Sequence, residues 1–311
     1  MSFDDPCRDG PVLIVGSIAY DSVKSPFGQM DEVLGGAACY ASVAASFFAP
    51  VRLVGVVGED FSDAHIAQLG QRDIDLTGLQ RAPGQTFRWS GYYEYDLNQA
   101  HTTATKLNVF ENFNPELPPA YRDSPYVFLA NISPELQLAV LDQVRRPKLV
   151  VCDTMNFWIE NAREALLEVL ARCDIALMND AEARELCNEP NLVAAGRKIL
   201  NLGPGVVIIK KGEHGATMMS HDSHFVAPGY PLEEVRDPTG AGDTFAGGLV
   251  GYLARCGETG DGTLRRAIIA GSVMASFTVE DFSLNRLFSL SPEDVTERYE
   301  EVTAMTRFGN F

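Results

Sequence analysis

Short apolar runs alternate with amphipathic stretches along the chain. Buried strands of a parallel sheet read as continuous apolar runs of this length, and such runs begin near residues 11, 51, 126, 148, 174 and 205. The stretches between the later runs have helical periodicity and include ELQLAVLDQVRR, NAREALLEVLARC and DAEARELC. The alternation of strand and helix predicts an α/β fold in which helices cover a mainly parallel sheet.

One stretch has the two-residue period of a strand. From Phe87 to Tyr95, Phe87, Trp89, Gly91, Tyr93 and Tyr95 occupy one parity, a polar turn follows around Asn98, and a second alternating run continues to residue 110. This pattern predicts a β-hairpin. The hairpin either packs on the core as an ordinary edge or forms a small separate sheet with residues 19–36.

Composition places the chain among globular proteins. With 311 residues, 46% of them hydrophobic, it can bury a large core. The net charge of −17 argues against a nucleic-acid or anionic-membrane partner. No apolar run has membrane-spanning length. The cysteines are scattered, so we expect reduced, buried thiols and a cytoplasmic location: Cys7, Cys39, Cys152, Cys173, Cys187 and Cys256.

The most informative motif is DPTGAGDTFAGG at residues 237–248. Its small residues can form a turn with unobstructed backbone N–H groups at the start of an apolar helix, which makes an anion site. Asp243 follows in the first helical turn, where the ionised carboxylate is stable and could accept a proton from a hydroxyl nucleophile. The plainer alternative is that Asp243 is only a favourable helix charge and that the glycines only allow close packing.

The motif is part of a longer match. Together with LGGAACYASVAASFFAPVRLVGVVGED at residues 34–60, it resembles the ribokinase-like carbohydrate kinases of the PfkB family over nearly the whole chain. The resemblance implies a single domain over residues 1–311, built as a three-layer α/β/α sandwich with a small β-sheet lid at about 19–34 and 86–110. It also implies transfer of the γ-phosphoryl group of ATP, with magnesium, to a hydroxyl of a small acceptor.

The resemblance implies roles on the acceptor side. Asp243 resembles the general base of the family, and the preceding backbone resembles its anion hole: Gly240, Ala241 and Gly242. Asp21 resembles the acidic residue that grips acceptor hydroxyls, although it could equally be a turn residue. Gly35 and Gly36 resemble the pair that lets the acceptor approach the backbone closely. Asp237 lies where the family often has a monovalent-cation loop, for which potassium is the expected ion.

The resemblance also implies a nucleotide side. In MNDAEARE, Asn179 and Glu182 resemble an Asn-x-x-Glu element that places magnesium and its waters near the phosphates, although the same spacing is a capping box. IIKKGEHGA resembles the nucleotide-side loop, and its glycines could also merely permit a turn: Lys211, Gly212 and Gly215. Lys210 or Lys211 could offset phosphate charge, and Gly271 and Ser272 would line the adenine pocket.

The acceptor is less well specified. Tyr40 stands where the family usually has Asn, and with Trp89 in the lid it could stack on a flat ring such as a nucleobase. Asn156, in the DTMN run at residues 153–156, resembles a position near the acceptor. Because no cluster of basic residues can be placed near the acceptor, we expect an unphosphorylated one. A sugar or polyol is the first expectation and a nucleoside the second.

Other classes of function have less support. A non-catalytic nucleotide or metabolite sensor would not need the carboxylate of Asp243. A dinucleotide-dependent oxidoreductase would need Gly-x-Gly-x-x-Gly after the first strand, where this chain has GSIAYD. The SHDSH run at residues 220–224 is better explained as a polar turn than as a zinc site. Pairing of lid sheets, as often seen in the family, would give a homodimer.

Overall fold

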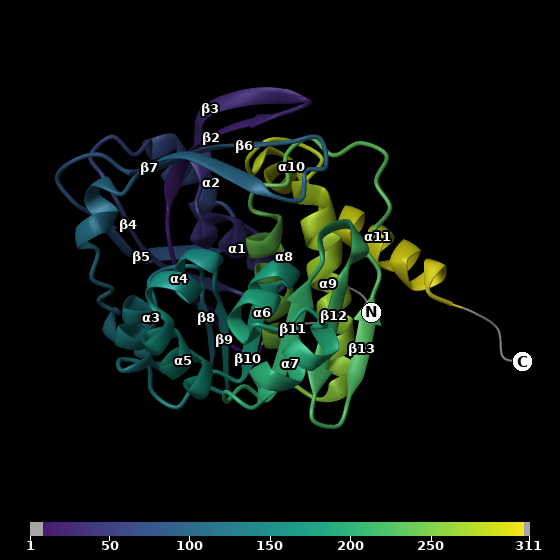
Figure 1. The fold of residues 1–311 in the computed structure, drawn as a ribbon. Coiled ribbons are helices and arrows are strands. Elements are labelled where there is room, and N and C mark those ends of the chain that lie inside the picture. The colour runs from purple at the N-terminus through teal and green to yellow at the C-terminus, as the bar shows by residue number, and fades with distance from the viewer. Residues whose placement is uncertain (1–8, 308–311) are drawn as a thin grey trace, which may run out of the picture.

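The computed structural model describes residues 9–307, in which nine strands form the main sheet in the order β13-β12-β11-β10-β9-β8-β1-β4-β5 (Figure 1). Neighbouring strands are parallel, except that β12 is antiparallel to both β11 and β13. The bounds are Val12–Val15 (β1), Val51–Val57 (β4), Ile74–Arg81 (β5), Tyr126–Leu129 (β8), Leu149–Asp153 (β9), Ile175–Asn179 (β10), Val206–Lys210 (β11), Ala216–Ser220 (β12) and His224–Ala227 (β13).

Helices cover both faces of this sheet, which makes the three expected layers (Figure 1). Alternate residues of β1 enter two different hydrophobic clusters: Val12 and Ile14 pack with α1, α8 and α9, whereas Leu13 and Val15 pack with α3, α5 and α7. The helices are Ala37–Ser46 (α1), Asp63–Gly70 (α2), Pro134–Leu141 (α3), Asn156–Asn161 (α4), Arg163–Arg172 (α5), Asp180–Cys187 (α6), Leu192–Leu200 (α7), Ala241–Cys256 (α8), Asp261–Thr278 (α9), Asn285–Ser289 (α10) and Pro292–Met305 (α11).

A smaller sheet lies above one edge of the main one (Figure 1). Its strands are Ala19–Ser25 (β2), Gly28–Gly35 (β3), Phe87–Tyr93 (β6) and Ala100–Lys106 (β7), in the order β3-β2-β6-β7. The hairpin predicted from residue 87 onward is therefore β6 and β7, and it joins β2 rather than the edge of the main sheet. Strands β2 and β6 pair in parallel, and their register places Trp89 beside Asp21. We call this smaller sheet the lid.

Helices α1 and α8 are in very close contact because α8 carries glycine where it faces α1. A Cβ on Gly247 would lie 2.2 Å from the carbonyl oxygen of Ala41, and one on Gly251 would lie 2.8 Å from the Cα of Ala45. Neither contact leaves room for a methyl group. The helix that begins at the DPTGAGD turn is therefore fixed against the core by backbone packing.

Two further expectations concern the whole chain. Within residues 9–307, no helix is long and apolar enough to cross a membrane. The expectation of buried thiols holds for part of the set: Cys39, Cys152 and Cys173 are buried, while Cys187 and Cys256 are partly exposed. Cys7 lies outside the described residues.

Candidate active site

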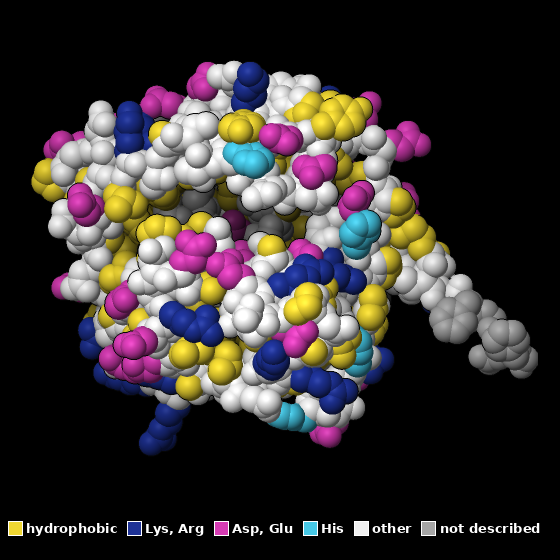
Figure 2. Space-filling model, viewed as in Figure 1, with side chains coloured by type: hydrophobic (Ala, Val, Ile, Leu, Met, Phe, Trp, Pro, Cys, Tyr) yellow, Lys and Arg dark blue, Asp and Glu magenta, His cyan; other side chains and the backbone are white. Residues whose placement is uncertain are grey.

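The predicted site residues gather where the parallel strands of the main sheet end and the lid begins. Asp153, Asn179 and Lys210 are the last residues of the adjacent strands β9, β10 and β11. The carboxyl ends of parallel strands share one edge of a sheet, where ligands of open α/β folds commonly bind. Figure 2 shows a hollow between the lid and the body of the protein, with acidic side chains inside it.

Asp243 lies in the first turn of α8, as the sequence predicts. Gly240 caps this helix with φ 77° and ψ 0°, a left-handed conformation that favours glycine. Burial raises the pKa of Asp243 to about 7, with the charge of Asp153 adding to the rise and Lys210 opposing it. The Ala241 N–H donates to the Pro238 carbonyl at 3.1 Å, so an anion at this turn must share or displace that hydrogen bond.

Lys210 provides a buried positive charge at the same place. Its Nζ donates to Asp153 Oδ2 at 2.7 Å, and the two side chains are 17% and 3% exposed. The same Nζ would lie 3.1 Å from a Cβ on Gly242, so the ammonium group faces the turn that opens α8. Lys211, the other lysine named from the sequence, precedes the short 3₁₀ helix Gly212–His214, so its nucleotide contact stays a prediction.

Asn179 and Glu182 form the capping box that their spacing predicts. Asn179 Oδ1 accepts from the Glu182 N–H at 2.8 Å, and Glu182 Oε2 accepts from the Asn179 N–H at 2.7 Å. Burial raises the pKa of Glu182 to about 7; Lys210 opposes the rise, and Asp153 and Asp243 add to it. These acidic groups are therefore close enough to influence one another's ionisation.

Asp21 and the two glycines of the first motif are in direct contact. Asp21 is 5% exposed, and a Cβ on Gly35 would lie 1.9 Å from its Oδ2. Gly36 has φ 91° and caps α1. Burial raises the pKa of Asp21 to about 7; a hydrogen bond from Gly36 opposes the rise, and the charges of Asp237 and Asp243 add to it. The structure thus brings Asp21 to the same cluster as the DPTGAGD turn.

Tyr40 faces this cluster from α1. Its ring packs against Gly240, where a Cβ would lie 2.5 Å from three ring atoms. The side chain is 1% exposed, and its hydroxyl has no hydrogen-bond partner within residues 9–307. Burial raises the pKa of Tyr40 well above its ordinary value, and Asp21, Asp237, Tyr93 and Asp243 add to the rise. The hydroxyl is an unsatisfied group among oxygen-bearing side chains.

Asp237 is buried at 1% exposure and organises the loop before α8. Its Oδ1 accepts from the Thr239 N–H at 2.9 Å, and its Oδ2 lies 3.5 Å from the Ser283 N–H. Burial raises its pKa, while the hydrogen bonds from Thr239 and Ser283 oppose the rise. A cation beside this carboxylate would stabilise its ionised form.

Several residues named from the sequence lie outside the buried cluster. Asn156 is exposed at the start of α4, and the first residue of the same DTMN run, Asp153, is the one that reaches the cluster. Gly271 lies where α9 crosses α8, with 2.6 Å between a Cβ there and the Phe245 carbonyl oxygen, and Ser272 is buried in the same helix. Nucleotide contacts of these two residues stay predictions.

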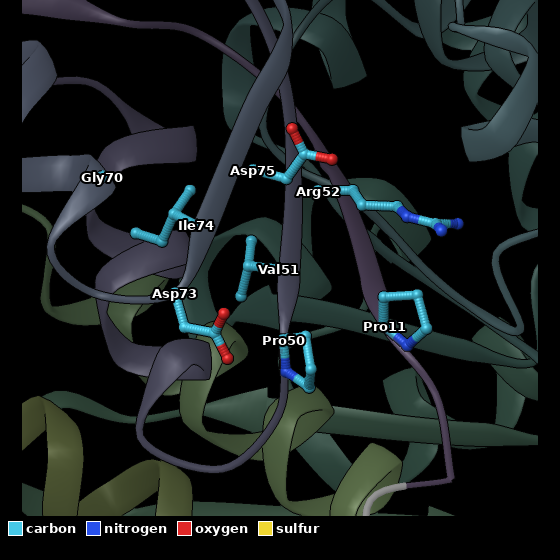
Figure 3. Close-up of a pocket in the computed structure, with 8 residues that line it drawn as sticks. All are labelled: Pro11, Pro50, Val51, Arg52, Gly70, Asp73, Ile74 and Asp75. Carbon is cyan, nitrogen blue, oxygen red and sulfur yellow. The ribbon is translucent and has the colours of Figure 1, made fainter.

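Other candidate sites carry less chemistry. A pocket of about 440 Å³ lies at the opposite edge of the main sheet, where β1, β4 and β5 begin (Figure 3). It is lined by Pro11, Pro50, Val51, Arg52, Gly70, Asp73, Ile74 and Asp75.

The SHDSH run joins β12 to β13, as a polar turn should. Among the residues that the structure describes, no group of three or more His, Cys, Asp or Glu side chains could hold a metal ion.

From the sequence, Asp153 is named only as the start of the DTMN run, Lys210 only as an alternative to Lys211, and Tyr93 only as part of the hairpin pattern. Asp153 and Lys210 each end a buried strand, and a polar residue at the end of such a run is the signal that could have selected them. Tyr93 shares a parity with Trp89 in the hairpin pattern, but only the structure shows that its hydroxyl accepts a hydrogen bond from Thr239 at 3.2 Å.

Comparisons with known proteins agree with this arrangement. Residues 12–288 match the family model described as pfkB family carbohydrate kinase. A cytidine kinase of Thermococcus kodakarensis is 30% identical over 249 residues, which cover 78% of this chain and 88% of that protein. A deoxyribokinase of Salmonella typhi is 25% identical over 251 residues, which cover 77% of this chain and 78% of that protein.

The fold also matches solved structures. A putative ribokinase II from E. coli, solved in complex with ATP and Mg²⁺, superposes with a TM-score of 0.77 at 20% identity, covering 94% of this chain and 99% of that one. Such a likeness confirms the expected architecture of a large, mainly parallel sheet with helices and a smaller lid-like sheet.

Proposed function

Because the chain belongs to the PfkB family of carbohydrate kinases, we propose that it transfers the γ-phosphoryl group of ATP to a hydroxyl of a small, uncharged acceptor. The observation that carries the proposal is the position of Asp243. It is a buried carboxylate in the first turn of α8, beside a glycine-rich turn with helix-end amides, and Lys210 faces the same turn. A base beside an anion site is what phosphoryl transfer to an alcohol needs.

Each residue has a defined part in this proposal. MgATP supplies the γ-phosphoryl group. Asp243 takes the proton of the acceptor hydroxyl as the new oxygen–phosphorus bond forms and the bond between the γ-phosphorus and the β-phosphate oxygen breaks. The amides at the start of α8 and the Lys210 ammonium stabilise the negative charge of the transferring group. The lid keeps out water, which would otherwise compete with the acceptor.

Cations would be held at two places. Glu182, with Asn179, would hold magnesium through water on the nucleotide side, since the buried charges of Asp153, Glu182 and Asp243 exceed the single charge of Lys210 there. A potassium ion is proposed beside Asp237, whose pKa burial raises.

We favour a nucleoside over a free sugar as the acceptor. The groups that act on the Tyr40 hydroxyl are the carboxylates of Asp21, Asp237 and Asp243, together with Tyr93. We call this group of side chains the acceptor chamber. Its carboxylates suit neutral hydroxyls and repel a phosphorylated acceptor. The rings of Tyr40, Trp89 and Tyr93 add apolar faces on which a base could pack, and the 30% identical relative is named as a cytidine kinase. The similarity to a deoxyribokinase keeps a free pentose as the second candidate.

The test is ATP consumption by the purified protein with Mg²⁺ against separate nucleosides, pentoses, hexoses and polyols. Formation of the phosphorylated acceptor is followed by mass spectrometry, and Asp243→Asn serves as the blank. A phosphorylated nucleoside that appears only with the unaltered chain would support the proposal. ATP binding without any phosphorylated product across the panel would contradict it and favour a non-catalytic sensor.

We expect catalytic efficiency to depend on the ionisation of Asp243. Burial raises the pKa of this carboxyl to about 7, and only the ionised form can accept a proton. The value of kcat/KM should therefore be constant above pH 8 and fall about tenfold per pH unit well below pH 7, since one proton is taken up. The measurement is kcat/KM from pH 5 to 9 at saturating MgATP. A value of kcat/KM that stays constant down to pH 5 would contradict an elevated pKa.

Tyr40→Phe should weaken acceptor binding without destabilising the fold. The change removes a buried hydroxyl that has no partner within residues 9–307, and burying such a group costs about 1–3 kcal/mol. Thermal stability should stay equal or rise, while the KM for the acceptor rises about 3- to 10-fold, which corresponds to one hydrogen bond. The measurements are the melting temperature and the KM of the acceptor found in the panel.

Tyr121→Phe is the matched control for this change. Tyr121 is also 1% exposed, but its hydroxyl donates to the Asp75 carbonyl at 2.9 Å. Loss of that bond should lower stability by about 1 kcal/mol and leave the KM unchanged. If Tyr40→Phe behaved in the same way, the Tyr40 hydroxyl would not bind the acceptor.

A further inference from the structure

The β6–β7 hairpin contacts both sides of the candidate site. At the end of β6, Tyr93 Oη accepts a hydrogen bond from the hydroxyl of Thr239 at 3.2 Å. Thr239 belongs to the DPTGAGD turn, so this contact joins the lid to the proposed anion hole. The Tyr93 side chain also lies close enough to Asp21, Asp237 and Asp243 for each to raise its pKa, after the larger effect of burial.

The tip of the hairpin reaches a different part of the site. A Cβ on Gly212 would lie 2.9 Å from Asn98 Oδ1, so the Asn98 side chain touches the backbone of Gly212. Gly212 has φ 55° and begins the 3₁₀ helix after β11. The turn is closed by hydrogen bonds from Lys211 N–H to Gly215 O at 2.7 Å and from Gly215 N–H to Gly212 O at 3.0 Å. The surface that Asn98 meets is therefore well ordered.

The tip itself has a defined conformation. Leu97 has φ 56°, which is unfavourable for a residue with a side chain. Its N–H donates to the Glu94 carbonyl at 3.1 Å, and the Asn98 N–H donates to Asp96 Oδ1 at 3.3 Å. These local bonds hold Asn98 in place although the residue is exposed. A strained turn that delivers one side chain to a distant loop indicates a constraint beyond joining two strands.

We propose that Asn98 is a positioning residue that couples occupancy of the nucleotide-side turn to closure of the hairpin over the acceptor chamber. The same hairpin contacts both the acceptor side and the nucleotide side of the site, because Tyr93 contacts the anion-hole loop and Asn98 contacts Gly212. A nucleotide that binds against the Gly212 turn therefore also holds the hairpin tip on that turn, and the acceptor then binds to a lid that is already in place. Such coupling is reciprocal between the two ligands. The inference rests on the proposed function and on a nucleotide at this turn, which the family resemblance of residues 208–216 implies.

Trp89 offers a direct readout of the hairpin. It lies on β6 beside Asp21 in the strand register, and its Nε1 donates to Thr102 Oγ1 on β7 at 3.1 Å. The chain contains two tryptophans, and the other, Trp158, lies on α4. In a Trp158→Phe background, the emission of Trp89 and its quenching by acrylamide report on the hairpin alone.

The experiment adds MgADP to this parent, to Asn98→Ala and to Gln99→Ala, an exposed neighbour in the same turn. Binding of MgADP is measured separately by calorimetry. We expect MgADP to shield Trp89 from acrylamide in the parent and in Gln99→Ala. In Asn98→Ala, MgADP should still bind. The shielding of Trp89 should fall to less than about a fifth of its value in the parent, because usual coupling factors begin at about fivefold.

The outcomes separate this inference from the proposed function. Equal shielding in Asn98→Ala and the parent would overturn it, as would MgADP binding without any shielding in the parent. Absence of MgADP binding in every variant would overturn the proposed nucleotide site, and the coupling with it.

Discussion

Asp243→Asn is expected to abolish turnover while leaving nucleotide binding largely intact. The amide has nearly the shape of the carboxylate but cannot accept the acceptor proton, and a positioned base contributes about 10²- to 10⁴-fold. The measurements are kcat with the acceptor found in the panel and calorimetric binding of MgADP. A variant with near-normal turnover would show that Asp243 is not the base.

The same variant should be more stable than the unaltered protein at pH 8. Burial raises the pKa of Asp243 to about 7, so the folded chain binds a proton that the unfolded chain has already released above about pH 4. This penalty grows as the pH rises from about 4 to 7 and is then complete. The gain in melting temperature should therefore be present at pH 8 and absent at pH 4.

Asp261→Asn is the matched control for the plainer interpretation of Asp243. Asp261 also lies in the first turn of a helix, α9. If Asp243 served only the helix dipole, both substitutions would lower stability slightly, by about 0.3–1 kcal/mol, and neither would affect kcat. We expect that pattern for Asp261→Asn alone.

Lys210→Met should have the second largest effect, on both stability and the pH profile. The change leaves Asp153 buried without its ion-pair partner, and breaking a buried pair costs about 3–5 kcal/mol. Lys210 also lowers the pKa of Asp243, so its loss should move the acid limb of kcat/KM to higher pH. Chemical denaturation gives the first quantity, and the pH series described for the unaltered protein gives the second.

Two variants make this result interpretable. Lys211→Met changes the neighbouring lysine, which precedes the Gly212 turn, and should alter stability by no more than about 0.5 kcal/mol. Lys210→Met combined with Asp153→Asn removes both charges and should recover part of the lost stability. An unchanged pH profile in Lys210→Met would show that Lys210 does not influence the ionisation of the base.

The architecture could be predicted because it depends on local patterns. The apolar runs at residues 126, 148, 174 and 205 became β8, β9, β10 and β11, and the two-residue period at Phe87 became the lid hairpin. Strand order and the parallel pairing of β2 with β6 depend on contacts between distant segments, which no local period encodes. The local pattern therefore leaves the choice between an edge hairpin and a separate lid open; the family resemblance favours the lid, and the structure confirms it.

The site was predictable to the extent that one motif contains it. Asp243 and its turn are contiguous, so their spacing alone defines them. Asp153 and Lys210 are separated by 57 positions and meet only because β9 and β11 end at the same edge of the sheet. Tyr93 and Asn98 lie against Thr239 and Gly212, which are more than one hundred positions away in the sequence, and no local pattern indicates these partners.

The contact between α1 and α8 has an evolutionary consequence. The helix that carries Asp243 packs through glycines at which a larger residue would force a backbone shift, so under the proposed mechanism the reaction and the folding of the chain depend on the same few positions. The lid meets the rest of the site through side chains such as Tyr93 and Asn98, which can change without disturbing that packing. We therefore expect substitutions in the lid to change the acceptor, and substitutions at these glycines to impair folding and phosphoryl transfer together.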